Sequence, residues 1–106
     1  MKIKIPTKSA ASLKKKIFEA VEDETLKTWV IRKSKEGNSY LTHKPEQWYD
    51  LALLSFLAKT DSLEINITHW TGKQSSKDID GYYIGRFTEV LLVHFASYYD
   101  TFEVIK

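Results

Sequence analysis

Hydrophobic residues recur along the first part of the chain at two different periods, which predict an extended lead followed by a helix. In the lead MKIKIP, Ile3 and Ile5 alternate with lysines, as in a strand. Thr7 and Ser9 then offer N-caps for a helix over residues 8–22. The apolar stripe of this helix comprises Ala10, Leu13, Ile17 and Ala20 or Val21, with Phe18 beside it. The acidic stretch EDET ends the helix, because carboxylates do not suit a helix C-terminus.

Alternation of side chains after the first helix predicts a hairpin. Residues 25–33 are rich in β-branched and aromatic types, with Trp29 and Ile31 on one side of the expected strand. The segment SKEGNS supplies turn residues through Gly37 and Asn38, and the following YLTH resumes an extended pattern. We therefore expect two paired strands here.

The segment 46–58 fits two interpretations. Pro45 followed by an acid is typical of a helix start, and such a helix would place on one face Trp48, Leu51, Ala52, Ser55 and Ala58. Residues 51–58 are also apolar enough for a buried strand, and a polar turn then separates them from the alternating segment 63–70. We favour the second interpretation, a hairpin.

The stretch GYYIGRFTEVLLVHF raises the question of a phosphate-binding loop. Three bulky residues separate Gly81 from Gly85, whereas such a loop needs bare amides converging on oxygen, so we expect a helix over about 80–97, capped by Asp78 or Asp80. The two glycines are expected to let another backbone pass close. The apolar stripe would comprise Tyr83 or Ile84, Phe87, Val90 or Leu91, His94 or Phe95, and Tyr98. A polar loop is expected over 71–78, and alternation in DTFEVIK predicts a short last strand.

These elements predict an α+β fold with an antiparallel sheet of four to five short strands and two helices packed on one face. The 106 residues, 42% hydrophobic and 13% aromatic, fit a single domain over 1–106. The absence of cysteine excludes disulfides and thiolate metal sites. No apolar run has the length of a signal peptide or of a membrane span, so we expect a cytoplasmic protein without membrane contact.

Candidate chemistry is sparse. The histidines at positions 43, 69 and 94 lie far apart in the sequence and give no metal-ligand spacing, and His94 is expected to be a core or boundary residue. Neighbouring carboxylates at helix ends have capping explanations, and no nucleophile motif is present. We therefore expect no catalytic residue, metal or cofactor that can be read from the sequence. One remaining hypothesis is a ligand cleft or enzyme site near His69, Trp70 and Arg86.

The charge distribution raises the hypothesis of nucleic-acid binding. Residues 1–36 hold ten Lys and Arg against five Asp and Glu, a net charge of +5, whereas the rest holds six against nine, a net charge of −3. A basic face of this kind is typical of phosphate-binding proteins. The candidate phosphate contacts are Lys8, Lys14, Lys15 and Lys16, with Lys2 and Lys4 nearby in sequence. Solvation of an outer helix face explains the same lysines and is favoured.

Large aromatic side chains favour a third function, protein binding. Trp and Tyr dominate protein interfaces when they are exposed, and we single out Trp48, Tyr49 and Trp70. Trp48 and Tyr49 are adjacent, so one of them is expected near the surface. The leading hypothesis is therefore a small non-catalytic intracellular interaction domain, for instance of the bacterial regulatory, antitoxin or immunity type. Its partner would be another protein or a second copy of itself.

Overall fold

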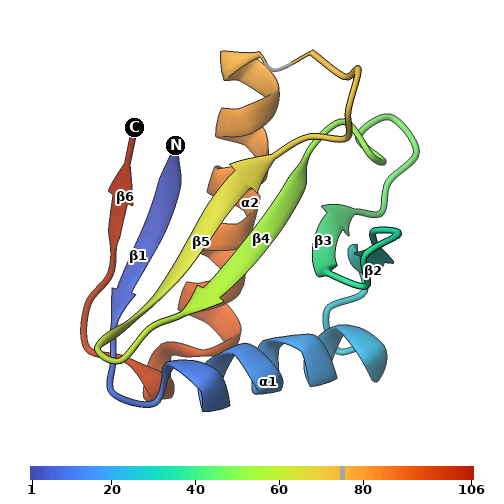
Figure 1. The fold of residues 1–106 in the computed structure, drawn as a ribbon. Coiled ribbons are helices and arrows are strands. Elements are labelled where there is room, and N and C mark those ends of the chain that lie inside the picture. The colour runs from blue at the N-terminus through green and yellow to red at the C-terminus, as the bar shows by residue number, and fades with distance from the viewer. Residues whose placement is uncertain (75) are drawn as a thin grey trace.

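The computed structural model describes residues 1–74 and 76–106 and consists of one sheet with two helices (Figure 1). The polar loop predicted over 71–78 includes Ser75, which lies outside the described residues. In chain order the elements are β1 (Lys2–Pro6), α1 (Ala10–Glu22), β2 (Trp29–Lys33), β3 (Ser39–His43), β4 (Leu53–Ala58), β5 (Ser62–Thr68), α2 (Lys77–His94), a 3₁₀ turn (Ala96–Tyr98) and β6 (Glu103–Ile105).

The sheet is antiparallel and has six strands in the order β2-β3-β4-β5-β1-β6. The N-terminal strand lies inside the sheet, where Ile3 is opposite Ile65 of β5 and opposite Val104 of β6. The predicted number of four to five strands was therefore too low. The alternation of Ile3 and Ile5 with lysines is a strand pattern, and both chain ends pair with the rest of the sheet.

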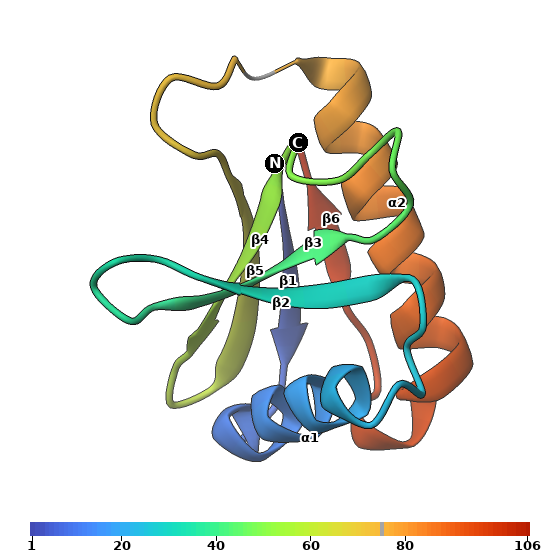
Figure 2. The same cartoon turned by 90° about the vertical axis from the view of Figure 1, so that its right-hand side faces the viewer.

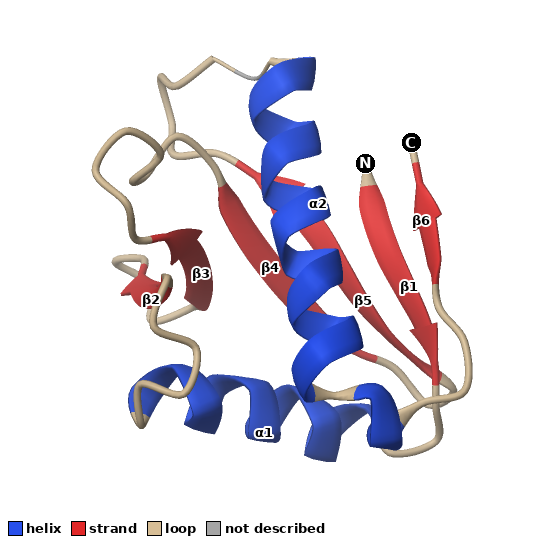
Figure 3. Ribbon diagram, turned by 180° about the vertical axis from the view of Figure 1, so that it is seen from behind, coloured by secondary structure: helices blue, strands red, loops and turns tan. Residues whose placement is uncertain are grey.

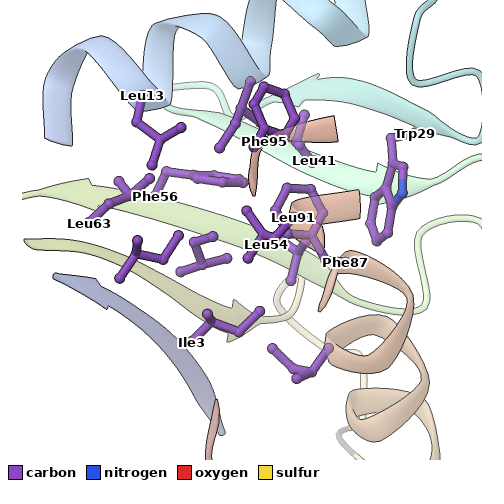
Figure 4. Packing of buried hydrophobic residues seen from close by; sticks show 14 of the residues in the cluster. Ile3, Leu13, Trp29, Leu41, Leu54, Phe56, Leu63, Phe87, Leu91 and Phe95 are labelled. Carbon is purple, nitrogen blue, oxygen red and sulfur yellow. The ribbon is translucent and has the colours of Figure 1, made fainter. Parts of the chain in front are cut away.

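Buried side chains from one face of the sheet and from both helices form a single hydrophobic cluster (Figure 4). Phe87 of α2 is central to it, with its ring centroid 5.3 Å from that of Trp29 and 5.7 Å from that of Phe56. Figure 3 shows α2 lying along the strands, while α1 crosses their ends. The apolar stripe of α1 that enters the cluster is Ala10, Leu13, Ile17 and Val21, in agreement with the sequence pattern.

α1 begins two residues after the predicted position and α2 three residues before it, although Ser9 is the N-cap of α1 as expected. α1 starts at Ala10 with Ser9 as N-cap, and the Ser9 backbone N–H donates to Thr7 Oγ1 at 3.1 Å. α2 starts at Lys77, and its N-cap is Ser76, whose Oγ accepts from the Ile79 backbone N–H at 3.1 Å. The expected caps Asp78 and Asp80 lie instead in the first turn, where acids interact favourably with the positive end of the helix dipole.

Three expectations about α2 were wrong. A Cβ added at Gly81 or Gly85 would meet nothing within 4 Å, so within residues 1–74 and 76–106 no other backbone passes close to either glycine. His94 is exposed, and Phe95 takes its place in the core at 5% exposure. The helix ends there and turns into the 3₁₀ segment, which leaves Tyr98 exposed as well. The rest of the stripe is buried as predicted: Tyr83, Ile84, Phe87 and Leu91.

The ambiguous segment 46–58 is a strand preceded by turns. β4 pairs with β5 along its whole length, with Phe56 opposite Ile65, so the hairpin interpretation is confirmed. The first hairpin is also present, with Gly37 at φ +87° in its turn, and Figure 2 shows it projecting from the other strands. β2 is shorter than the predicted 25–33 because the Thr25 backbone N–H bonds to Asp23 Oδ1 in a local turn.

Candidate interaction surface

The guanidinium of Arg32 lies between two aromatic rings on the face of the sheet that carries no helix. Its centre is 5.5 Å from the ring centroid of Tyr49 and 5.6 Å from that of Trp70. Tyr40 packs edge-on against Trp70 at 6.0 Å between centroids. Asp50 binds Arg32 through both oxygens, with Nε–Oδ1 at 3.1 Å and Nη2–Oδ2 at 2.9 Å. We call these five residues the Arg32 cluster.

Strand register places this cluster away from the core. Arg32 is paired with Tyr40 across β2 and β3, and both alternate with Ile31 and Leu41, which face the core. The other three members come from the β3–β4 loop and from the residues after β5. The cluster is therefore assembled from three separate segments of the chain.

Asp50 is held in an uncommon backbone conformation. Its φ is +59°, in the left-handed region that few non-glycine residues occupy, although Asp tolerates it better than most. The hydrogen bond from Arg32 to Asp50 raises the pKa of the guanidinium further above its ordinary value. The carboxylate thus compensates the Arg32 charge and fixes the plane of the guanidinium between the rings.

A buried hydroxyl network beneath the cluster anchors the β3–β4 loop. Thr42 Oγ1 accepts the Asp50 backbone N–H at 3.0 Å and lies 2.9 Å from the Ala52 carbonyl and 3.0 Å from the Tyr83 hydroxyl. The Tyr83 hydroxyl in turn donates to the Trp48 carbonyl. Each hydroxyl has one proton and both carbonyls only accept, so Thr42 donates to Ala52 and Tyr83 donates to Trp48. The loop that carries Tyr49 and Asp50 is therefore tied to β3 and α2.

The three aromatic residues singled out from the sequence do not all meet. Tyr49 and Trp70 both contact Arg32, and Tyr49 is 41% exposed. Trp48 points to the other side of the loop and stacks on Tyr82 of α2, with centroids 3.7 Å apart and planes at 9°. Trp48 is thus part of the packing between loop and helix.

Sequence reasoning missed Arg32, Asp50 and Tyr40 as members of this surface. Arg32 and Tyr40 lie opposite each other in the two strands of the first hairpin, and the position of the turn in the sequence could have predicted this pairing. The contribution of Asp50 depends on its left-handed backbone, which no pattern in the sequence indicates. The cluster also contains an unsatisfied donor: Trp70 Nε1 is buried and has no hydrogen-bond partner among the described residues.

A buried histidine lies on the other side of the sheet. His43 is 1% exposed, neither ring nitrogen has a partner among the described residues, and its ring is 4.8 Å from that of Trp29 and 5.4 Å from that of Tyr82. Burial, and then the nearby charge of Arg86, lower the pKa of His43 below its ordinary value. Neutral imidazole is therefore the form that the fold favours.

The three residues named for a ligand cleft or enzyme site, His69, Trp70 and Arg86, have separate surroundings. Arg86 borders a cavity of about 180 Å³ that is lined by His43 rather than His69. His69 Nε2 lies 3.0 Å from Asp80 Oδ1 of α2. Trp70 contacts the Arg32 cluster instead.

The lysines proposed to contact phosphate have separate surroundings. Lys14 Nζ donates to the Phe56 carbonyl at 3.3 Å, whereas Lys16 Nζ lies 5.9 Å from the ring centroid of Tyr98. Lys8 and Lys15 are exposed.

On the open face of the sheet, Lys2 and Lys59 form ion pairs with the buried Glu64. Glu64 accepts from Lys59 Nζ at 2.9 Å and from Lys2 Nζ at 3.4 Å. The hydrogen bond from Lys59, followed by the contribution of Lys2, lowers the pKa of Glu64 below its ordinary value of 4.5.

Within residues 1–74 and 76–106, no group of three or more His, Asp or Glu side chains is placed to hold a metal ion. In the same ranges, no helix is long and apolar enough to cross a membrane. Comparison of the chain with models of protein families, with curated proteins and with solved structures gave no match. The Arg32 cluster is the candidate site, because it brings one Arg, two Tyr and one Trp together on one face of the sheet.

Proposed function

We propose that the protein is a small non-catalytic interaction module, which binds another protein through the Arg32 cluster. The observation that carries this proposal is the composition of the cluster. Arg, Tyr and Trp are the residue types most enriched among side chains that dominate binding energy at protein interfaces. Here one Arg, two Tyr and one Trp meet on a single face of the sheet.

Preorganisation supports the same function. Binding is weakened by the entropy of immobilising long side chains, about 0.5–1.5 kcal/mol for each. Asp50 and the two rings already hold Arg32 in one orientation, and the side chain is still 38% exposed. A partner would therefore meet a preorganised surface in which the side chains of Arg32 and Tyr49 are partly accessible.

The chemistry of the partner follows from the charge of the cluster. Asp50 compensates Arg32, so the surface is aromatic and nearly neutral rather than basic. Such a surface fits an apolar or aromatic side chain of a partner together with a carbonyl or carboxylate acceptor. It fits a nucleic-acid backbone less well, because affinity there depends on uncompensated cations.

The test is affinity capture from a lysate of the cells that encode the protein. The wild-type chain should retain a partner that Tyr49→Ala and Trp70→Ala lose. Leu57→Ala is the matched control, since Leu57 is also a large exposed side chain, at 51%, and lies outside the cluster. Retention of the same partner by all three variants, or no partner at all, would refute the proposal. A low-salt mobility shift with DNA or RNA would favour the nucleic-acid alternative instead.

A further inference from the structure

The free edge of β2 is a second surface, separate from the aromatic face of the Arg32 cluster. β2 ends the strand order of the sheet, and no strand in the described ranges pairs with its outer side. The other edge strand, β6, has only three residues, whereas β2 has five and contains no proline. An edge strand presents unpaired backbone N–H and C=O groups, with which a further strand can pair.

Hydrogen-bond alternation shows which backbone groups face outward. At the two ends of the hairpin, the Lys44 N–H bonds to the Thr28 carbonyl and the Ser34 N–H bonds to the Asn38 carbonyl. Bonded and non-bonded pairs alternate in an antiparallel ladder, so Trp29, Ile31 and Lys33 direct their backbone groups away from β3. The Trp29 N–H is already used by the Leu26 carbonyl, which leaves its own carbonyl toward the edge.

A groove accompanies this edge. It has a volume of about 530 Å³ and runs between the C-terminal end of α1 and β2. Its apolar lining comes from Val21, Leu26, Trp29, Val30 and Ile31. The groove therefore offers apolar side-chain contacts beside the outward backbone groups.

Charges are distributed unequally along the edge. The start of β2 lies beside the acidic end of α1, where Glu22 and Glu24 line the groove and Asp23 is the C-cap. Three carboxylates at a helix C-terminus oppose the helix dipole, and no basic residue is present in the last turn of α1. Lys27 and Lys44 also line the groove and reduce this negative charge without cancelling it.

The far end of β2 has the opposite sign. It carries Lys33, and Lys35 follows in the turn. An antiparallel strand with the same sequence would place its basic end at the acidic end of the groove, and a parallel one would oppose like charges. In an antiparallel pair of β2 strands, the basic end of each copy thus lies beside the acidic end of the other.

We propose that two copies of this chain associate by antiparallel pairing of their β2 edges, about a two-fold axis at Ile31. The outward groups then match: Ile31 exchanges two hydrogen bonds with the partner's Ile31, and each Lys33 N–H reaches the Trp29 carbonyl of the other copy. Lys33 of one copy lies opposite Trp29 of the other, beside Glu22 and Glu24. The interface is isologous, as expected of a homodimer.

Cysteine cross-linking tests the register directly, since the chain contains no native cysteine. In a bonded antiparallel pair the two Cα atoms are about 5.5 Å apart, which suits a disulfide. Ile31→Cys should therefore form a covalent dimer under mild oxidation at least about tenfold faster than Val93→Cys, although Val93 is 72% exposed. Equal rates for the two variants would overturn the proposal.

A charge exchange provides the second measurement and does not perturb the core. The molar mass in solution should rise with concentration from 12.3 kDa toward twice that value. Lys33→Glu alone should weaken the dimer about tenfold, and mixing it with Glu22→Lys/Glu24→Lys chains should restore association as a heterodimer. A strict monomer at all concentrations, or a dimer that ignores these changes, would overturn the proposal. Because Tyr49→Ala leaves the β2 edge unchanged, it should dimerise normally, which separates this result from that of the capture experiment.

Discussion

Replacement of Thr42 by valine tests the anchoring of the β3–β4 loop. Thr42 is fully buried, and valine retains its branched shape while removing Oγ1. The Asp50 N–H then loses its acceptor at 3.0 Å, and the Ala52 carbonyl loses its donor at 2.9 Å. Each of these two polar groups costs about 1–3 kcal/mol when left unsatisfied, so Thr42→Val should lower the free energy of unfolding by about 2–6 kcal/mol.

Urea denaturation with linear extrapolation measures this loss, and Thr42→Ser is the matched control. Serine keeps the hydroxyl and removes one methyl group, which costs about 1 kcal/mol. The Asp50 amide should also exchange with solvent faster in Thr42→Val, because its hydrogen bond is gone. If Thr42→Val is no less stable than Thr42→Ser and the amide exchanges as in wild type, the network does not hold the loop.

Three further predictions concern stability. Gly81→Ala and Gly85→Ala should each stabilise the protein by about 1 kcal/mol in thermal or urea unfolding, because both sites are helical, exposed and open; destabilisation would reveal a contact that the geometry lacks. The lowered pKa of Glu64 means that its two ion pairs stabilise the fold above pH 4.5 and that this contribution is lost as pH falls further. Glu64→Gln should therefore be less stable than wild type at neutral pH and should lose less stability on acidification; parallel pH profiles of the two proteins would contradict this. Because the pKa of His43 is lowered in the fold, the free energy of unfolding should decrease as pH falls below 6.5, where the unfolded chain binds a proton more readily. His43→Gln should reduce this decrease, whereas replacement of the exposed His94 by Gln should not; a larger effect of His94→Gln would contradict the assignment.

The period of the hydrophobic pattern was enough to predict the type of most helices and strands. The alternation in β5 and the helical stripe of α2 each depend on neighbours within one element, so sequence spacing predicts them. β1 pairs with residues 62–66 in β5 and 103–105 in β6, which are distant in the sequence, so the spacing of its own residues does not predict these partners and the number of strands was underestimated. His94 was misplaced for a related reason, because the helix ends at this residue and Phe95 turns inward.

The candidate surface could be predicted only in part. Size and amphipathic character single out Tyr49 and Trp70, and both contact Arg32. Arg32 itself has no local signal, since its position between the rings depends on three segments meeting and on the left-handed backbone of Asp50. Trp48 has the same chemistry as Trp70 but stacks on Tyr82. Its backbone carbonyl accepts a hydrogen bond from the Tyr83 hydroxyl, and this long-range contact has no signal in the sequence.

The most direct test of the interaction proposal is an NMR titration of the captured partner into the labelled chain. The three tryptophan indole N–H signals report on three different surroundings: buried Trp29, Trp48 stacked on Tyr82, and Trp70 beside Arg32. The proposal predicts that the Trp70 indole and the Arg32 Nε–H signals shift on binding, while the Trp29 indole stays in place. Shifts confined to the lysine-bearing face of α1, with the Trp70 signal unchanged, would contradict it.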